Sequence, residues 1–250
     1  MTSGHSHSQA HGPAHTSSHA TAHSPGHPHR GHAHRRSIAL FGGTFDPIHT
    51  GHIAIANAAQ RRFHLDAIHF IPSSRPPHKS QRSLAPFTHR YAMVALACTD
   101  HPGYIPSLAE APADGTTPHV FYSIDTVKKF RREHPDDHLF FILGADQFLE
   151  IPTWRSYEAL LDCCDFIIAH RPGFRLDALR LVIPPEKLNR ITSPDPETIA
   201  LRKTKVHLLS TVTSHVSSTE VRQRLEKHQS IHGLVPARVE AYIQGQALYR

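Results

Sequence analysis

The sequence predicts one α/β domain with a doubly wound parallel sheet, and three observations support this. From Ser37 onward, short apolar runs alternate with longer stretches of helical period, the pattern of a parallel sheet with crossover helices. Several runs are apolar at nearly every position, as in strands buried on both faces. The 250 residues suffice for one sizeable core. The expected fold is therefore Rossmann-like, with its ligand crevice beyond the carboxyl ends of the strands.

The strand candidates are the short apolar runs Ile38–Phe41, Ala67–Ile71, Leu139–Leu143, Asp165–Ala169 and Val206–Leu209. Helices are expected at about Gly51–Phe63, Thr88–Cys98, Ser123–Arg132, Ser156–Leu161, Ser218–Lys227 and Ala237–Gln244. The first of them spaces Ile53, Ala56 and Ala59 at helical intervals. Two proline-containing stretches, Ala111–Pro118 and Ile183–Lys205, are expected to be surface loops, and the second has room for a short helix.

Residues 1–35 differ in composition from the rest of the chain. They hold ten of the 25 histidines, mixed with Ser, Gly, Ala and Pro, and lack the spaced apolar residues of a core. We expect a disordered His-rich extension over 1–35, followed by a single domain over 36–250. Neutral imidazoles in a flexible chain can bind Zn²⁺, Ni²⁺ or Cu²⁺ without a defined geometry. Adventitious binding of divalent metal and a solvated tail without a role both stay open.

Charge and apolar patterning narrow the class of protein. No run of eighteen or more apolar residues occurs and the N-terminus lacks a signal peptide, so a cytoplasmic protein without membrane contact is expected. Cys98, Cys163 and Cys164 belong to no C-x-x-C motif and are expected to be reduced packing residues. The net charge of +6 favours an anionic ligand, but the basic residues are scattered and no nucleic-acid signature occurs. The oligomeric state stays open, a homo-oligomer included.

The motif GGTFDPIHTGH at 42–52 directly follows the first expected strand and opens the first helix. Gly42 and Gly43 are expected to permit a tight turn and a close approach of backbone to phosphate. His49 and His52 can both point into the crevice, where the positive end of the helix dipole attracts anions. Taken alone, the histidine pair is more typical of solvated or metal-binding side chains than of a phosphate site.

A second motif, VSSTEVR at 216–222, follows the last expected strand. Ser217 and Glu220 match a capping box, which predicts a helix N-terminus here. Three hydroxyls, free backbone N–H groups and Arg222 one turn into the helix would together form a phosphate site. A well-capped surface helix explains Ser217 and Glu220 but gives no reason for Thr219 and Arg222.

From about Ser37 to Arg250 the chain resembles the nicotinate-nucleotide adenylyltransferase family of the H-x-G-H nucleotidyltransferase superfamily. Besides the two motifs above, the resemblance rests on PPHK at 76–79, YSIDT at 122–126, LGAD at 143–146, Trp154, RPG at 171–173 and VPARVEAYIQGQALY at 235–249. It implies transfer of AMP from ATP to nicotinate mononucleotide, releasing pyrophosphate, in NAD biosynthesis. Nicotinamide mononucleotide or phosphopantetheine as acceptor, and metal storage by the histidines, are the alternatives.

The resemblance also implies roles for individual residues. ATP would contact Gly42, Gly43, Thr44, Phe45, His49, His52, Ser217, Ser218, Thr219 and Arg222. The mononucleotide would contact Tyr122, Ser123, Asp146, Trp154 and Arg171. Charge on the leaving pyrophosphate would be stabilised by His49, His52, Lys79 and Arg222. No acidic cluster typical of a protein-built metal cage occurs, so Mg²⁺ held mainly by the ATP phosphates is expected and no protein metal ligand is assigned. Trp154 as an interior anchor is the alternative reading of that residue.

Overall fold

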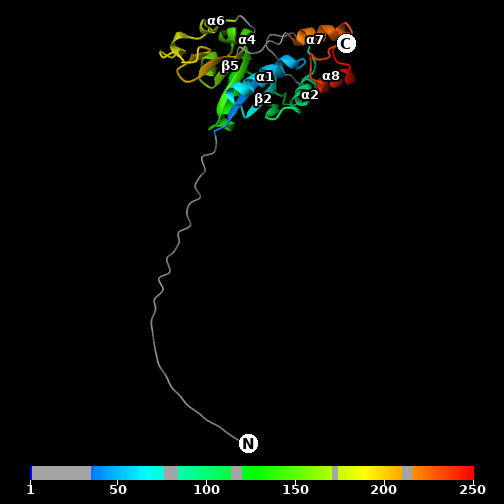
Figure 1. Cartoon of the computed structure of the whole chain (residues 1–250), viewed down its shortest axis with the longest axis horizontal. Coiled ribbons are helices and arrows are strands. Elements are labelled where there is room, and N and C mark those ends of the chain that lie inside the picture. The colour runs from blue at the N-terminus through cyan, green and yellow to red at the C-terminus, as the bar shows by residue number, and fades with distance from the viewer. Residues whose placement is uncertain (2–34, 76–83, 114–119, 171–173, 210–215) are drawn as a thin grey trace. The chain divides into compact units, whose positions relative to one another are not determined.

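The computed structural model describes residue 1 and residues 35–75, 84–113, 120–170, 174–209 and 216–250. In this part of the chain seven strands form one sheet (Figure 1). The strands are β1 (Ser37–Gly43), β2 (Ala67–Pro72), β3 (Tyr104–Pro106), β4 (His138–Gly144), β5 (Asp165–Ala169), β6 (Thr198–Ala200) and β7 (Lys205–Leu209). Their order across the sheet is β3-β2-β1-β4-β5-β7-β6. All neighbouring strands are parallel except β6 and β7, which are antiparallel.

Helices connect these strands. The α-helices are α1 (Thr50–Phe63), α2 (Phe87–Cys98), α3 (Ser123–Glu133), α4 (Ala145–Leu149), α5 (Tyr157–Leu161), α6 (Leu176–Arg180), α7 (Ser218–Glu226) and α8 (Ala237–Gly245). Two short 3₁₀ helices are η2 (Ile151–Thr153) and η3 (Pro185–Lys187). No helix within the described ranges has the length and apolar content needed to cross a membrane.

The strand order reverses between β1 and β4. The chain begins in β1, moves outward to β2 and β3, and then returns to pair β4 with the other edge of β1, with Phe41 opposite Ile142. The carboxyl ends of β1 and β4 are therefore neighbours at this switch point. Open α/β sheets bind their ligands in the crevice at such a point. The doubly wound fold expected from the sequence is confirmed.

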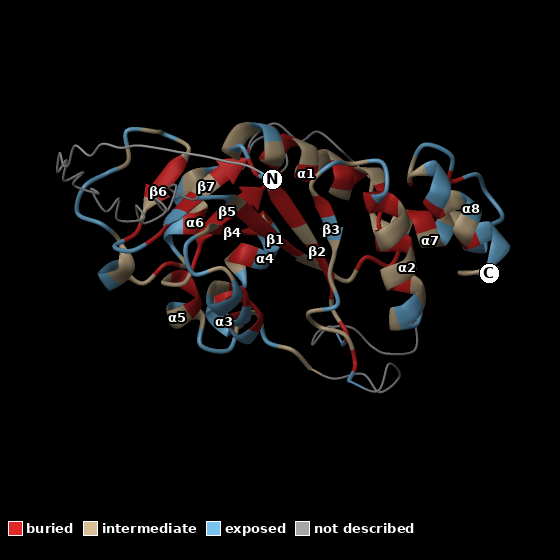
Figure 2. Ribbon diagram, turned by 90° about the horizontal axis from the view of Figure 1, so that it is seen from below, coloured by how far each residue is buried: buried red, intermediate tan, exposed pale blue. Residues whose placement is uncertain are grey.

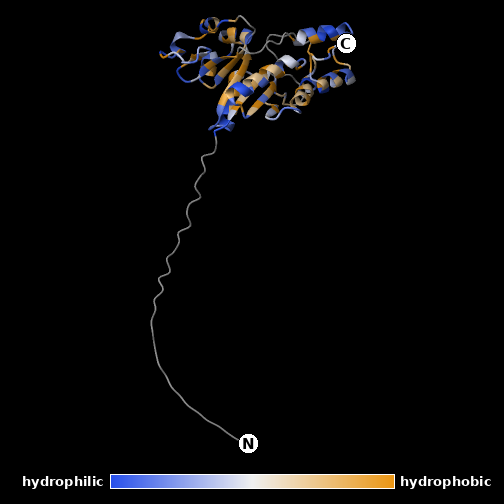
Figure 3. Cartoon of the chain, in the orientation of Figure 1, coloured by the Kyte–Doolittle hydropathy of each residue, from blue (hydrophilic) through white to orange (hydrophobic). Residues whose placement is uncertain are grey.

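Both faces of the sheet are buried, and alternate side chains of β1 supply two separate cores. Ala39 and Phe41 pack with α1, α2, α7 and α8, whereas Ile38 and Leu40 pack with α3, α4, α5 and α6. Figure 2 shows the strands as the buried centre of the domain, and Figure 3 shows them as hydrophobic. Burial of one such aliphatic side chain stabilises the fold by about 1.5–3 kcal/mol. Near-continuous apolar runs are therefore the expected strand sequence here.

All five expected strands and all six expected helices are present, most of them within one or two residues of the expected bounds. The short elements β3, β6, α4, α6 and η2 were not expected. Runs of three to five residues seldom carry a readable period, although α5, equally short, was predicted. The prediction of a loop over Ile183–Lys205 is wrong at Thr198–Ala200, which pairs with β7, while η3 accounts for the short helix. Arg35–Arg250 form one compact unit. Residues 2–34 and most of 111–118 lie outside the described residues, so the disordered extension and the boundary at residue 35 stay predictions.

Candidate active site

The loop after β1 does not turn at its glycines. Gly42 and Gly43 are extended residues of β1, paired with β2, so the tight turn expected at them is wrong. The left-handed residue of this loop is Phe45, with φ of 48°, and the Asp46–Pro47 peptide bond that follows is cis. The structure gives Gly43 a steric reason instead, because a Cβ there would lie 2.9 Å from Cζ of Phe45.

The ring of Phe45 belongs to the core. The residue is 1% exposed, and its ring meets the rings of Phe41, Phe70 and His52, the last at 5.0 Å with an interplanar angle of 72°. The Phe45 side chain therefore supports His52 from within the domain and does not line the crevice. A contact of Phe45 with the nucleotide would therefore come from its backbone, and it stays a prediction. Thr44, which precedes it, is partly exposed.

His49 and His52 form a stacked pair at the start of α1. Their ring centroids are 3.7 Å apart with an interplanar angle of 28°. His49 is the N-cap residue, and its backbone N–H donates to Nδ1 of His52 at 3.2 Å. A neutral imidazole that accepts at Nδ1 carries its proton on Nε2. Nε2 of His52 is therefore a hydrogen-bond donor at a helix N-terminus, where anions are already favoured.

His49 is the more buried member of the pair. It is 8% exposed, and its Nδ1 is buried without a hydrogen-bond partner among the described residues. Burial lowers the pKa of His49 to about 4, because the charged imidazolium loses its hydration. His49 is therefore a neutral ring at pH 7, and it would act by hydrogen bonding rather than by charge.

The two sequence motifs meet at the N-terminus of α7. The Oγ of Ser217 accepts from the backbone N–H of Glu220 at 3.1 Å, which confirms the expected cap. Ser218 Oγ donates to the Pro47 carbonyl at 3.0 Å, and Arg222 Nη1 donates to the Asp46 carbonyl at 2.6 Å. Segments more than 170 residues apart in sequence thus share one side of the crevice.

Asp46 carries contacts that the sequence analysis missed. It is fully buried, and its Oδ1 accepts from the Tyr249 hydroxyl at 2.6 Å and from the Ala85 N–H at 3.1 Å. Its Oδ2 lies 3.7 Å from Nη1 of Arg222. Burial and the Asp46 charge raise the pKa of Tyr249, which stays protonated as a donor. From the sequence, Asp46 was given no role beyond its place in the motif GGTFDPIHTGH.

Arg90 of α2 was also missed. It is 2% exposed and donates to the carbonyls of Thr44, Ser73, Ser74 and Ala85. It thereby ties the loop after β1 to the loop after β2. Arg90 precedes Met93 and Val94 by three and four residues, so helical periodicity puts this arginine on the buried face of α2. That position was the signal that a buried, carbonyl-binding arginine stands here.

The residues expected to bind the mononucleotide lie on the β4 side of the switch point. Tyr122 is the exposed N-cap of α3, and the guanidinium of Arg155 lies 4.5 Å over its ring. Trp154 is partly buried, edge-on to Phe141 of β4 with centroids 6.4 Å apart. Ser123 begins α3, and Asp146 is exposed in the first turn of α4. Lys79 and Arg171 lie outside the described residues.

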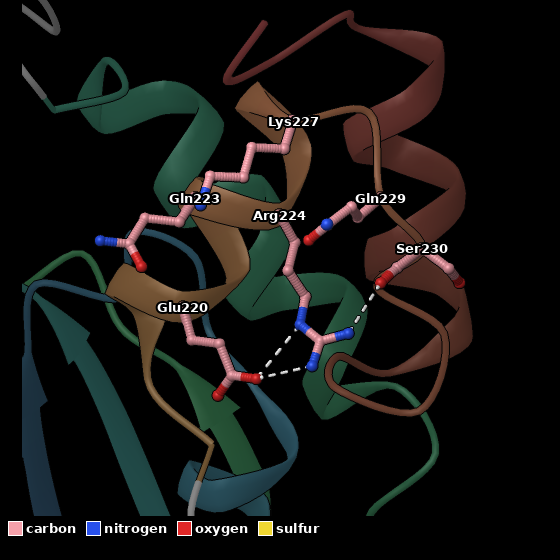
Figure 4. A pocket seen from close by; sticks show the side chains of 6 residues that line it. All are labelled: Glu220, Gln223, Arg224, Lys227, Gln229 and Ser230. Carbon is pink, nitrogen blue, oxygen red and sulfur yellow. Dashed lines mark hydrogen bonds and ion pairs between the residues drawn. The ribbon is translucent and has the colours of Figure 1, made fainter.

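A metal-binding cluster or a pocket on α7 would be another place where a ligand could bind. No group of three or more His, Cys, Asp or Glu that could hold a metal ion occurs within the described ranges. An open pocket on α7 is lined by Glu220, Gln223, Arg224, Lys227, Gln229 and Ser230 (Figure 4). Arg224 there pairs with Glu220 at 3.0 Å, and it follows Arg222 by two residues, so it points to the other side of the helix. The pocket therefore lies on the side of α7 away from Arg222, although Glu220 of the motif lines it.

Comparison with known proteins identifies the family. The cytidylyltransferase-like family model matches residues 40–224. A protein of Moorella thermoacetica named "Probable nicotinate-nucleotide adenylyltransferase" is 39% identical over 214 residues, covering 85% of this chain and 91% of that protein. The chain belongs to the nicotinate-nucleotide adenylyltransferases of the cytidylyltransferase-like family. A protein of Citrifermentans bemidjiense with the same name is 38% identical, and the match covers 85% of this chain and 97% of that protein.

Solved structures of adenylyltransferases share the fold. A Plasmodium falciparum nicotinic acid mononucleotide adenylyltransferase complexed with NaAD superposes with a TM-score of 0.65. It is 21% identical in sequence, and the match covers 86% of this chain and 98% of that one. The same enzyme complexed with APC gives a TM-score of 0.64. The family and the fold predicted from the sequence motifs are confirmed.

Proposed function

We propose that this chain transfers the adenylyl group of ATP to nicotinate mononucleotide, giving nicotinate adenine dinucleotide and pyrophosphate. One observation carries the proposal for the ATP side. Ser218 and Arg222 of α7 donate to the carbonyls of Pro47 and Asp46 in the loop after β1. These contacts bring Arg222 and the stacked His49–His52 pair together at the carboxyl edge of the sheet. This arrangement collects hydrogen-bond donors and a positive charge at two helix N-termini, as a polyphosphate requires.

The reaction needs no covalent intermediate. A phosphate oxygen of the mononucleotide attacks the α-phosphorus of ATP in line, and the bond to the bridging oxygen of pyrophosphate breaks. A phosphate monoester is already ionised at neutral pH, so no general base is assigned. The chain supplies position and charge stabilisation. The His49 ring, the Nε2–H of His52, the Arg222 guanidinium and Lys79 would stabilise charge on the leaving pyrophosphate, and each such donor is worth about 10²–10³ in rate.

The other site residues predicted from the sequence belong to the same proposal. Gly42, Gly43, Thr44 and Phe45 would present backbone to the nucleotide, and the hydroxyls near the α7 N-terminus would bind outer phosphates. The mononucleotide would lie against Trp154 and near Tyr122, with Ser123, Asp146 and Arg171 as its polar contacts. The Arg155 guanidinium over the Tyr122 ring adds positive charge on this side. The carboxylate of nicotinate is thereby favoured over the uncharged amide of nicotinamide.

A divalent cation, which we propose to be Mg²⁺, would accompany ATP. The described residues offer no cluster of three metal-ligating side chains, and the buried Asp46 carboxylate is engaged by Tyr249 and Ala85. This donor set fits a cation held by phosphate oxygens and water. When bound, the cation would neutralise part of the triphosphate charge. We also propose a cytoplasmic location.

A panel of acceptors tests this function. Purified protein is mixed with ATP, Mg²⁺ and one acceptor, and pyrophosphate release is measured. Nicotinate mononucleotide is expected to give the highest kcat/KM, ahead of nicotinamide mononucleotide, with phosphopantetheine inactive. Preference for another acceptor would change the substrate while leaving adenylyl transfer intact. An absence of pyrophosphate release with every acceptor would contradict the proposed function.

A further inference from the structure

Asp46 is a buried carboxylate at the centre of the motif contacts, and its charge is shared among several partners. Its Oδ1 accepts from Tyr249 and from the Ala85 N–H, while Oδ2 has no hydrogen-bond partner among the described residues. Arg222 lies 3.7 Å from Oδ2, and the buried guanidinium of Arg90 contributes a favourable electrostatic interaction with Asp46. An uncompensated buried charge is costly, so each of these groups matters for the placement of the others.

Arg222 is placed by the same loop. Its Nη1 donates to the Asp46 carbonyl at 2.6 Å and its Nη2 to Thr219 Oγ1 at 3.3 Å, and its side chain is 21% exposed. These contacts use two of the five N–H donors of the guanidinium. The rest can bind an anion. Should Arg222 instead close the 3.7 Å gap to Asp46 Oδ2 and form a full ion pair, its charge would be neutralised within the protein.

We propose that Tyr249 is a positioning residue for Arg222 in the adenylyl transfer. Its hydroxyl donates to Oδ1 of the Asp46 carboxylate, and this hydrogen bond keeps the Arg222 guanidinium available to the ATP phosphates. The inference rests on the proposed function. The Tyr249 hydroxyl donates at 2.6 Å from 203 residues away in sequence, which couples the segment after α8 to the loop after β1. Without that donor, the Asp46 carboxylate would attract the guanidinium of Arg222, the nearest cation to Oδ2 among the described residues.

Tyr249→Phe tests this with little change in packing. Loss of a hydrogen bond to a charged group is expected to lower kcat/KM for ATP about tenfold and to weaken pyrophosphate inhibition equally, with KM for the mononucleotide unchanged. Tyr242→Phe is the matched control, because the Tyr242 hydroxyl bonds His89 Nδ1 at 2.9 Å and does not bond Asp46. It should leave all three constants near their wild-type values.

Asp46→Asn completes a double-mutant cycle. With the carboxylate charge removed, adding Tyr249→Phe should have no further effect on ATP kinetics. The double variant has no buried unpaired charge, so it can be assayed even if Tyr249→Phe alone is too unstable. Wild-type kinetics in Tyr249→Phe, or equal additional losses in both backgrounds, would overturn the inference. A lower thermal midpoint as the sole effect of Tyr249→Phe would also overturn the inference. An inactive wild type would contradict the proposed function instead, so the two failures are distinguishable.

Discussion

Gly43 lies directly against the ring of Phe45, so close that a Cβ at Gly43 would come within 2.9 Å of Cζ and 3.0 Å of Cε1. Phe45 has left-handed backbone and a ring enclosed by Phe41, Phe70 and His52, so it has little room to move. The glycine is therefore required by the packing of a buried ring that in turn supports His52. Gly42 differs, because its Cβ would meet Phe141 at an ordinary 3.5 Å.

These two glycines give the first prediction. Gly43→Ala should destabilise the protein by about 1–3 kcal/mol and lower kcat, because the displaced Phe45 ring moves His52. Gly42→Ala is the matched control for packing and should leave the thermal midpoint nearly unchanged. A raised KM for ATP in Gly42→Ala alone would show that backbone at this position approaches the nucleotide. Equal thermal midpoints in both variants would refute the packing role of Gly43.

The same loop shows what the sequence could predict and what it could not. The apolar run at Ile38–Phe41 and the H-x-G-H element are local signals, so the strand, the helix start and the family follow directly from them. The roles of Asp46 and Arg90 depend on Tyr249 and on the carbonyls of Thr44 and Ser73, which are distant in sequence. Local periodicity carries no information about such long-range partners. The turn at Phe45 was missed for another reason, since glycine normally takes the left-handed position.

The second prediction concerns the two nitrogens of His52. Asn keeps an acceptor near the Nδ1 position, which receives the His49 N–H, but it removes the Nε2 donor. His52→Asn should therefore lower kcat and kcat/KM by about 10²–10³ while the fold survives. His52→Gln, which places an amide near the Nε2 position, should retain more activity. Steady-state kinetics and thermal midpoints of both variants check this.

His49→Ala belongs to the same series and should also lose activity. Metal content separates the phosphate-binding reading of the pair from a metal-binding one, and it should be measured on protein lacking residues 1–35. Loss of stoichiometric Zn²⁺ together with activity would favour the metal-binding reading. Near-wild-type kcat in His49→Ala and His52→Asn would contradict the mechanism.

Trp154 gives the third prediction. Its partly buried ring contacts Phe141 edge-on, so it has both a packing role and a surface to offer. Trp154→Ala should raise KM for the mononucleotide about ten- to hundredfold through loss of stacking, with a smaller change for ATP. Phe141→Leu changes a ring that packs against Trp154 and leaves Trp154 itself in place, so it is the control. Because Trp154 is the single tryptophan, mononucleotide binding should also quench the intrinsic tryptophan fluorescence.

If both KM values rise together in Trp154→Ala, and Phe141→Leu behaves in the same way, Trp154 is an interior anchor. The assignment of the pyridine-binding side would then lose its principal residue, although the ATP side would be unaffected.

The fourth prediction concerns residues 1–35. Deleting them should leave kcat/KM almost unchanged, because the segment contains no candidate core residue and precedes β1. The same deletion should abolish most retention on immobilised Ni²⁺, since ten histidines leave with it. Replacing those histidines by serine at full length is the matched control. A tenfold loss of kcat/KM on deletion but not on replacement would assign the segment a role other than metal binding.

The last prediction is a pH dependence of stability. Burial lowers the pKa of His49 and of His69 from 6.5 to about 4. Both rings are therefore neutral in the folded protein at pH values where the unfolded chain binds protons. Their contribution to stability is complete above pH 6.5 and is lost as the pH falls toward 4.

Glu110 acts in the opposite direction. Burial raises its pKa from 4.5 to about 6, even though the Thr126 hydroxyl donates to its Oε1 at 2.8 Å and favours the ionised form. The folded state therefore retains a proton on Glu110 that the unfolded chain releases, and this stabilising contribution is present below pH 4.5 and is lost as the pH rises through 6.

The two histidines together outweigh the one carboxyl group, so the free energy of unfolding should fall as the pH is lowered from 6.5 to 4.5. Urea unfolding across that range should give free energies that fall with pH, with a steeper fall in Glu110→Gln and a shallower one in His69→Asn. An unfolding free energy that rises as the pH falls would contradict the burial of the two histidines as neutral rings.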